Sequence, residues 1–487
     1  MKLISYLPVL LLLVLRLPAA DVPRPNLIII NIDNLGYADI GPFGGRNQTP
    51  ELERMAAEGR KLTSFYAAPV CSPSRASLMT GCYPKRVLPI PGVLFPAAAV
   101  GLNPTERTIA EVLKDAGYAT AMIGKWHIGD QPAFLPTKQG FDSYFGLPYS
   151  NDMGPAADGV KSSRDQNPPQ LKADPVAVDP DGTGVRGLQP PLPLLENDQV
   201  IAHVRREEQI DLLRRYTERT VSFVRAPRDR PFFLYLAPNA VHFPHYPGDN
   251  FLGKSGTGLL GDWVREIDWT VGQVLGALRE AKLAESTLVL FTSDNGGPVG
   301  LGACNAPLRG SKGSTWEGGI RVCTIAWWPG RIPAGTSTDA MAGMLDVLPT
   351  FARIAGASLP QDRKIDGVDL WPILVGEPSA PPRDHFFYFL GLNLQAVRLG
   401  PWKLHLASGE LYHLVDDIAE AHDASAQQPE RVKRLRELAD SMKTDLALTG
   451  IGPGCRPLGR LANPKPIIAV DGTVRPELAG AAKNFPR

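Results

Sequence analysis

Two pairs of acid and amide side chains stand directly after long apolar runs. Asp33 and Asn34 follow the run Leu27–Ile32, and Asp294 and Asn295 follow a second run of the same kind. Carboxylate and amide oxygens together form a hard ligand set, which suits Ca²⁺ or Mg²⁺ rather than Zn²⁺. For either pair taken alone, capping of a strand end or a turn is the more common use of Asp and Asn.

Basic side chains occupy similar places. Lys125 and His127 close a third apolar run, and His242 comes just beyond a fourth. Lys312 lies between glycines, which let backbone and side chain approach a ligand closely. A positive charge beside an imidazole suits an anionic group, although a solvated lysine and a packed histidine explain Lys125 and His127 equally well.

A cysteine opens the run CSPSRASLMTG at residues 71–81. Cys71 stands beside Pro73 and Arg75, on a turn that opens a short apolar helix, which is an unusual place for a structural thiol. Its alternative role is that of a buried, small hydrophobic residue. The other motifs that recur along the chain favour a chemical role.

The elements that must position these residues alternate between strands and helices. Buried strands are predicted over Leu27–Ile32, Ala119–Ile123, Phe232–Ala237, Thr287–Thr292 and Ile320–Trp328. Helices are predicted over residues 50–59, 108–116, 264–278 and 346–355. This alternation predicts the α/β class, with a large, mostly parallel sheet covered by helices on both faces. Because ligands bind outside the carboxyl ends of such strands, both acid–amide pairs are expected to face one crevice.

The pattern changes twice along the chain. Residues 154–200 are rich in Pro, Gly and Asp, and we predict a long loop inserted into a larger unit that spans 21–376. Short strands and a charged helix then predict a smaller C-terminal α+β domain with an antiparallel sheet over 377–450. Its predicted elements are His385–Leu390, Ala396–Leu399, Trp402–Leu406, Glu410–Leu414 and Pro429–Lys443. Residues 451–487 form a tail rich in Pro and Gly, for which no structure is predicted.

Charge and cysteine content restrict the class of protein. The 487 residues include 51 basic and 50 acidic side chains, so the chain has no general attraction for nucleic acid or membrane surfaces. The five cysteines do not suggest a disulfide scaffold. A disulfide bridge between Cys304 and Cys323 is an alternative that the sequence does not decide.

The first 20 residues read as an export signal. Lys2 is followed by an apolar stretch, which Arg16 interrupts and which ends in Pro18-Ala19-Ala20. A cleaved signal peptide is predicted, with an uncleaved anchor as the alternative. No later segment has enough uninterrupted apolar residues to span a bilayer, so stable membrane insertion is not expected.

The run at 71–81 resembles the signature C-x-P-S-R-x-x-L-x-T-G of the sulfatases, in which the cysteine is oxidised after translation to formylglycine. Accidental agreement at its fixed positions is expected on the order of once in a million trials. NIDNLGY at 31–37 and FTSDNG at 291–296 resemble the two metal motifs of this family, with Asn34 where a second Asp is usual. The resemblance spans roughly 26–376 and is closest to the arylsulfatase A and N-acetylgalactosamine-6-sulfatase branch.

The resemblance implies a set of site residues in the alkaline phosphatase superfold. A divalent cation, Ca²⁺ more than Mg²⁺, would be held by Asp33, Asn34, Asp294, Asn295 and the formylglycine derived from Cys71. The hydrated formylglycine would attack sulfur, with Arg75 holding its diol. The substrate-binding residues would be Lys125, His242, Lys312 and, by its match to arylsulfatase A-like enzymes, Ser150. His242, with Lys312, would protonate or orient the leaving alcohol, and His127 would accept the proton that accompanies sulfate release.

The expected partners are a sulfate ester, with a sulfated saccharide favoured over an aryl sulfate, and a formylglycine-generating enzyme during maturation. We expect an exported protein, periplasmic or secreted, or lysosomal in a eukaryote. The 154–200 segment is expected to shape the substrate pocket together with Trp402, Lys403 and His405, with His245 as a further pocket residue.

Three other functions compete with this interpretation. A phosphoester or phosphonate hydrolase of the same superfold would use a similar nucleophile, but a two-zinc site needs more His and Asp near His242 than the chain offers. A non-catalytic sulfated-glycan binder would explain Asn34 as a decayed metal ligand. A structural exported protein leaves the clustering of reactive residues unexplained.

Overall fold

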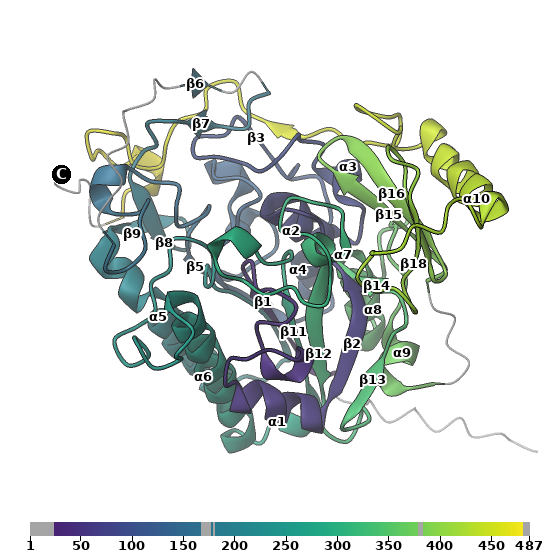
Figure 1. Ribbon diagram of the computed structural model, residues 1–487. Coiled ribbons are helices and arrows are strands. Elements are labelled where there is room, and N and C mark those ends of the chain that lie inside the picture. The colour runs from purple at the N-terminus through teal and green to yellow at the C-terminus, as the bar shows by residue number, and fades with distance from the viewer. Residues whose placement is uncertain (1–23, 167–176, 179–180, 378–382, 481–487) are drawn as a thin grey trace, which may run out of the picture.

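The computed structural model describes residues 24–166, 177–178, 181–377 and 383–480. The predicted signal peptide lies outside these residues. A mixed sheet of 11 strands forms the centre of the molecule, in the order β13-β2-β12-β11-β1-β10-β4-β5-β8-β9 with β14 beside β2 (Figure 1). The strands are β1 Asn26–Ile32, β2 Arg60–Tyr66, β4 Ala119–Gly124, β5 Ser143–Gly146, β8 Leu192–Glu196, β9 Gln199–Val204, β10 Phe232–Ala237, β11 Thr287–Ser293, β12 Arg321–Trp327, β13 Thr336–Thr338 and β14 Ala342–Gly343.

The middle of the sheet is parallel. Strand β1 pairs with β10 on one side and β11 on the other, and β4 and β5 continue the parallel run beyond β10. Alternate residues of β1 enter different cores: Leu27 and Ile29 pack on one face of the sheet, and Ile28 and Ile30 on the other. Two buried faces explain why the predicted strands read as continuous apolar runs.

Helices cover both faces. The face that buries Ile28 is covered by α1 Pro50–Glu58, α5 Arg206–Arg225 and α6 Leu259–Glu280. The opposite face is covered by α2 Cys71–Thr80, α4 Ile109–Asp115 and α8 Val347–Ala355. Helix α4 begins at a capping box, in which Thr108 and Glu111 bond each other's backbone N–H groups. The predicted α/β class is confirmed.

A separate antiparallel sheet forms at the C-terminal side, as predicted. Its order is β15 His385–Leu390, β16 Asn393–Leu399, β17 Trp402–His405 and β18 Leu411–His413. Helix α10, Pro429–Asp440, packs on it and lies at the right edge of Figure 1. The other apolar contacts of this sheet include Tyr66, Tyr83 and Ile320 of the larger unit, so the two sheets share a core.

The expectation of an irregular loop over 154–200 is wrong in its last part. Strand β8 pairs antiparallel with β5, and β9 follows it at the sheet edge. Leu192 and Leu194 pack on the face of the sheet that buries Ile28, and Leu195 packs on the opposite face, so this strand is buried on both sides. It also contains Pro193, and a proline within an apolar run argues against a strand. Further upstream, β6 Ala177–Val178 pairs with β7 Val185–Arg186.

Residues 451–480 of the tail, the part that the structure describes, form regular contacts with the larger unit. Strand β19, Gly459–Arg460, pairs with β3, Val100–Gly101, and Ile467 and Ile468 are buried in the core of the larger unit. All five cysteines are free thiols, so the bridge between Cys304 and Cys323 is not formed.

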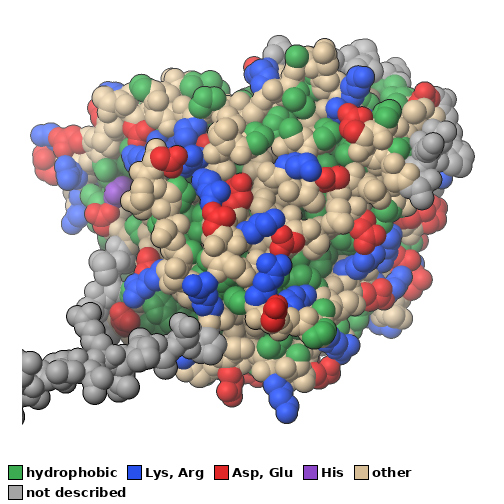
Figure 2. Space-filling view, turned by 180° about the vertical axis from the view of Figure 1, so that it is seen from behind, with side chains coloured by type: hydrophobic (Ala, Val, Ile, Leu, Met, Phe, Trp, Pro, Cys, Tyr) green, Lys and Arg blue, Asp and Glu red, His purple; other side chains and the backbone are tan. Residues whose placement is uncertain are grey.

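The surface carries both signs of charge. On the face shown in Figure 2, basic and acidic side chains are interspersed, in keeping with the formal net charge of +1. Within the described ranges, no helix is long and apolar enough to cross a membrane.

Candidate active site

The carboxyl ends of four neighbouring strands converge on one site. Asp33 follows β1 and Asp294 follows β11, and the N–H of Asp294 donates to the carbonyl of Ile32 at 2.9 Å. Lys125 follows β4 and His242 comes after β10. The order β11-β1-β10-β4 therefore brings together residues that are more than 200 positions apart in sequence, as Asn34 and Asp294 are at 260 positions.

The backbone turns sharply where these strands end. Asn34 and His127 both adopt left-handed φ angles, 63° and 67°. Gly124 has φ 113°, and a Cβ there would lie 2.1 Å from the carbonyl oxygen of Ala237. Only glycine fits this position, which lets the chain pass close to β10 and deliver Lys125 to the site.

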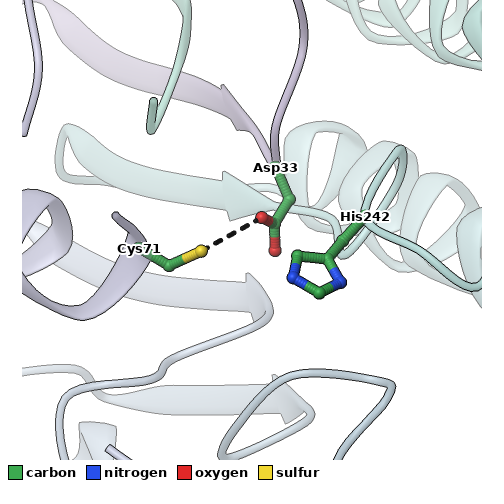
Figure 3. Close-up of side chains that lie close together, drawn as sticks. All are labelled: Asp33, Cys71 and His242. Atoms are coloured by element: carbon green, nitrogen blue, oxygen red, sulfur yellow. Dashed lines mark hydrogen bonds between the residues drawn. The ribbon is translucent and has the colours of Figure 1, made fainter. Parts of the chain in front are cut away.

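Cys71 is the first residue of α2, a helix whose residues are all buried. Three side-chain oxygens lie around its Sγ: Oδ1 of Asp33 at 3.5 Å, Oδ1 of Asn295 at 3.5 Å and Oδ1 of Asn34 at 3.8 Å. Figure 3 shows the thiol pointing to the Asp33 carboxylate with the His242 ring beside it. Asp33, Cys71 and His242 each place a ligand atom within 4.8 Å of the others.

The oxygens around Cys71 fit a bound cation. A thiol carries one proton, so it can satisfy only one of the three oxygens that face it. Oδ1 of Asn34 also accepts from the Asn295 amide at 2.8 Å, but an amide oxygen has a second lone pair, so these oxygens can still accept a further positive partner. Carboxylate and amide oxygens suit Ca²⁺ or Mg²⁺, so the predicted ligands Asp33, Asn34 and Asn295 fit this group. Asp294, the fourth, turns Oδ1 to the backbone N–H of Asn34 at 3.1 Å.

Arg75 lies one helical turn after Cys71 and binds Asp294 rather than the thiol. Its Nε and Nη2 donate to Oδ2 of Asp294 at 3.0 and 2.8 Å, and Nη1 donates to the carbonyl of Lys125. Nη2 also lies 3.4 Å from Asp33. Both carboxylates are therefore fixed in orientation by one buried guanidinium.

The two carboxylates have opposite pKa shifts. Burial opposes ionisation of Asp33, but Lys125, His242 and Arg75 hold its pKa well below the usual value. Burial and the charge of Asp33 raise the pKa of Asp294. Burial, with the Asp294 and Asp33 charges, also raises the pKa of the Cys71 thiol to about 12.

Lysines stand on two sides of Cys71. Lys125 bonds Asp33 and donates to Oγ of Ser150 at 3.1 Å. Lys312 reaches the cysteine itself, with Nζ 3.5 Å from Sγ. Burial alone would lower the pKa of Lys312, but the charges of Cys71 and Asp33 raise it, so the side chain stays an ammonium group.

The two histidines are bound through different ring atoms. Nε2 of His127 bonds the carbonyl of Leu94 at 2.8 Å, while Nδ1 has no partner among the described residues. Nδ1 of His242 bonds the carbonyl of Phe243 at 2.5 Å. Burial lowers the pKa of both rings. The charge of Lys125 lowers the pKa of His127 further, and the charge of Lys312 adds to the effect at His242, whose pKa falls to about 4. Both imidazoles are therefore neutral near pH 7.

One residue close to the site was missed in the sequence. Oδ1 of Asp152 lies 4.0 Å from Nδ1 of His242. It stands two positions after Ser150, in a turn where an acidic residue is common, so nothing local distinguishes it.

Lys403 and His405 of the C-terminal sheet turn inward and do not line the expected pocket, whereas Trp402 lines a separate cavity with Pro401 and Arg431. The Lys403 side chain is wholly buried against Glu317 and Glu420, and His405 bonds Glu420 at 2.9 Å. The ring of His405 stacks on Trp316 with centroids 4.0 Å apart. His245 is also buried, and its ring packs against Trp263. A buried ammonium group is stable only when it is paired, and Glu317 and Glu420 supply its partners inside the protein.

A family model described as Sulfatase matches residues 25–357, which is more than half of the chain. The chain belongs to the sulfatase family. Human arylsulfatase A is 41% identical over 412 residues, covering 81% of this chain and 77% of the human protein. N-acetylgalactosamine-6-sulfatase of the dog is 39% identical, covering 81% of this chain and 75% of its own.

Solved structures agree with the family. The crystal structure of Ps i-CgsB in complex with k-i-k-neocarrahexaose has a TM-score of 0.69 at 30% identity, covering 86% of this chain and 92% of that one. The sulfatase PsFucS1 from Pseudoalteromonas sp. has a TM-score of 0.74 at 26% identity, covering 88% of this chain and 92% of that one. The chain is thus an enzyme of the class that hydrolyses sulfate esters.

Proposed function

We propose that this sulfatase cleaves sulfate monoesters with residue 71 as its nucleophile, after oxidation of Cys71 to formylglycine. The observation that carries the proposal is the position of Cys71 at the head of α2, with Lys312 at 3.5 Å and the Asp33 and Asn295 oxygens at the same distance. The hydrated aldehyde supplies a hydroxyl nucleophile that can release sulfate by returning to the aldehyde, which a thiol or a serine hydroxyl cannot do.

The lysines and Ser150 form the anion-binding part of the site. Lys312 approaches residue 71 directly, and Lys125 lies beside Asp33 and donates to Oγ of Ser150, whose own O–H is left to donate to a sulfate oxygen. Fixed positive charges in a buried site stabilise the negative charge that builds up on sulfate oxygens during the reaction. Arg75 does not bind the anion; its guanidinium holds Asp294 and Asp33 in place.

The histidines handle protons on opposite halves of the cycle. With Nε2 of His127 bonded to a carbonyl, the ring carries its proton there, and the unpartnered Nδ1 is free to accept one during sulfate release. Nδ1 of His242 is likewise bonded to a carbonyl, so Nε2 is left to orient the leaving alcohol together with the Lys312 ammonium group.

Asp33, Asn34, Asp294 and Asn295 would hold one divalent cation, Ca²⁺ in preference to Mg²⁺. Bound there, the cation polarises oxygens and lowers the pKa of a coordinated hydroxyl. Ca²⁺ is favoured because it accepts varied sets of carboxylate and amide oxygens in flexible geometry, whereas Mg²⁺ requires a near-ideal octahedron and retains several waters.

The preferred substrate is a sulfated saccharide. Two relatives point to sugars: one is named for N-acetylgalactosamine 6-sulfate hydrolysis, and a solved relative was captured with a neocarrahexaose. Export would follow from the first 20 residues, and maturation would need a formylglycine-generating enzyme.

The test compares enzyme produced with and without a co-expressed formylglycine-generating enzyme. Mass spectrometry of the peptide containing residue 71 should show the aldehyde or its hydrate only in the first sample, and activity on sulfated monosaccharides and para-nitrophenyl sulfate should follow its fraction. Equal activity in a sample whose Cys71 is entirely unmodified would refute the nucleophile. Para-nitrophenyl phenylphosphonate and para-nitrophenyl phosphate in the same panel test the phosphonate and phosphoester hydrolases, which are excluded if sulfate esters are cleaved at least about a hundredfold faster.

A further inference from the structure

A buried ion cluster joins the C-terminal sheet to the segment that carries Lys312. Lys403, in β17, places Nζ 2.9 Å from Oε1 of Glu317 and 2.9 Å from Oε1 of Glu420. All three side chains are wholly buried. Glu317 belongs to the larger unit, where it begins the short helix α7, Glu317–Ile320. Lys403 and Glu420 belong to the C-terminal side.

The cluster fixes the end of the Lys312 segment. Lys403 also donates to the carbonyl of Thr315 at 2.7 Å, and the backbone N–H of Glu317 donates to Oε2 of Glu420 at 2.7 Å. Tyr66 and Arg321 bond the second carboxylate oxygen of Glu317, at 2.7 and 3.2 Å. Both carboxylates thus have their oxygens paired, and the charges hold one geometry.

The start of the segment is held by the same region. Nη1 of Arg309 donates to the carbonyl of Glu420 at 2.8 Å, and its guanidinium lies 3.8 Å from the ring centre of Trp316. Trp316 in turn stacks on His405 of β17. Residues 309–317, here called the Lys312 segment, are therefore fastened at both ends to the C-terminal side.

Between these two ends, the segment faces the nucleophile. The N–H of Lys312 donates to the carbonyl of Gly297 at 3.2 Å, and that of Gly313 to the carbonyl of Pro69 at 2.9 Å. Pro69 lies two residues before Cys71, and Nζ of Lys312 ends 3.5 Å from Sγ. The segment therefore connects the C-terminal side to the ammonium group that lies beside residue 71.

We propose that Lys403 and Glu420 are positioning residues for Lys312, so that the C-terminal sheet sets the place of a cation in the active site. The proposal rests on the function proposed above for Lys312. Removal of the Lys403 ammonium leaves two buried carboxylates facing each other, with Arg321, on the far oxygen of Glu317, left to offset their charge. Their repulsion then displaces Glu317 and the segment before it. Apolar contacts already attach the sheet to the larger unit, so the ion cluster adds orientation rather than attachment.

The test is a double-mutant cycle on kcat/KM for para-nitrophenyl sulfate, using Lys403→Met, Lys312→Ala and the double variant. Lys403→Met should lower kcat/KM roughly tenfold to a hundredfold in the wild-type background, because misplacement of a catalytic group by about 1 Å has an effect of this size. In the Lys312→Ala background it should lower kcat/KM by less than about twofold. If Lys403→Met lowered kcat/KM by the same factor in both backgrounds, the proposal would be overturned, because a general loss of folded protein lowers kcat/KM equally in both.

The control variant is Lys85→Met. Lys85 is also a buried lysine between the larger unit and the C-terminal side, but it donates to the carbonyl of Ala447. Lys85→Met should lower kcat/KM only slightly, and by the same factor in the wild-type and Lys312→Ala backgrounds. If Lys403→Met does not fold by near-UV circular dichroism, Glu420→Gln, which keeps the side-chain volume, replaces it in the cycle: unequal losses support the proposal and equal losses overturn it. A wild-type enzyme that cleaves no sulfate ester would instead refute the proposed function, independently of this cycle.

Discussion

The side-chain amide of Asn295 donates a 2.8 Å hydrogen bond to Oδ1 of Asn34. The two residues come from the ends of neighbouring strands, and both turn an oxygen toward Cys71. Asn34 stands where the family usually has an aspartate, so the oxygen cluster carries two carboxylates rather than three. The hydrogen bond uses one lone pair of Asn34 Oδ1 and leaves the other for a cation.

Asn34→Asp should therefore tighten Ca²⁺ binding. A carboxylate adds one negative charge directly beside the cation, and the number of charged ligands is the main control of Ca²⁺ affinity in proteins. We expect the dissociation constant to fall by roughly tenfold or more, measured by calorimetric titration of metal-free enzyme. The control is Asn47→Asp, a buried asparagine that bonds Asp39 and Thr257. Unchanged affinity in Asn34→Asp would remove Asn34 from the metal ligands.

The positions that converge on Cys71 were predictable because each belongs to a local motif at the end of a strand. Asp33, Lys125 and Asp294 each follow an apolar run that reads as a parallel strand, and such strands present their carboxyl ends at one edge of the sheet. Local sequence patterns, together with this rule about the carboxyl ends of parallel strands, were enough to predict that these residues lie near one another.

The cluster of Lys403, Glu317 and Glu420 could not be predicted in the same way. Lys403 lies in strand β17 and Glu317 begins helix α7, 86 positions away, so no spacing or periodicity relates them. A lysine and a histidine on a short antiparallel strand are usually solvated, which led to the wrong expectation of a polar pocket at Lys403 and His405. Strand β8 was missed for a different reason, since it is buried on both faces and contains Pro193, which argues against a strand.

His127→Ala should trap sulfate on the enzyme. The variant lacks the unpartnered Nδ1 that accepts a proton during release, so transfer to residue 71 proceeds while release slows. Intact-protein mass spectrometry after brief exposure to para-nitrophenyl sulfate should show the sulfated form accumulating. Absence of any adduct, under conditions in which wild type turns over, contradicts this role.

His242→Ala should slow the transfer step instead, and most for substrates whose alcohol is a poor leaving group. Without the ring, the leaving oxygen loses its orienting partner, so the rate depends more steeply on the pKa of the alcohol. A series of aryl sulfates measures this dependence through kcat/KM. The control is His413→Ala, because His413 is the last residue of β18 and pairs with Asp416 rather than with a residue of the site. An unchanged slope in His242→Ala, or an equal change in His413→Ala, contradicts the assignment.

Glu266 should make the free energy of unfolding depend on pH. It is a buried residue of α6 whose carboxylate accepts the N–H of Gly248 at 2.8 Å. Burial raises the pKa of Glu266 from 4.5 to about 8; the Gly248 hydrogen bond and the charges of Arg164 and Arg214 act in the opposite direction, and that of Asp211 raises it further.

The native state therefore keeps a proton that the unfolded chain has already lost. Stability should fall as pH rises from about 4.5 to about 8, by at most roughly 1.4 kcal/mol for each pH unit, and then level off. Glu266→Gln places a neutral side chain of the same size at this position, so its melting temperature should fall less steeply over that range. Glu280→Gln is the control, since Glu280 ends the same helix with an exposed side chain. Parallel curves for wild type and Glu266→Gln would show that the Glu266 carboxyl does not titrate differently in the native and unfolded states.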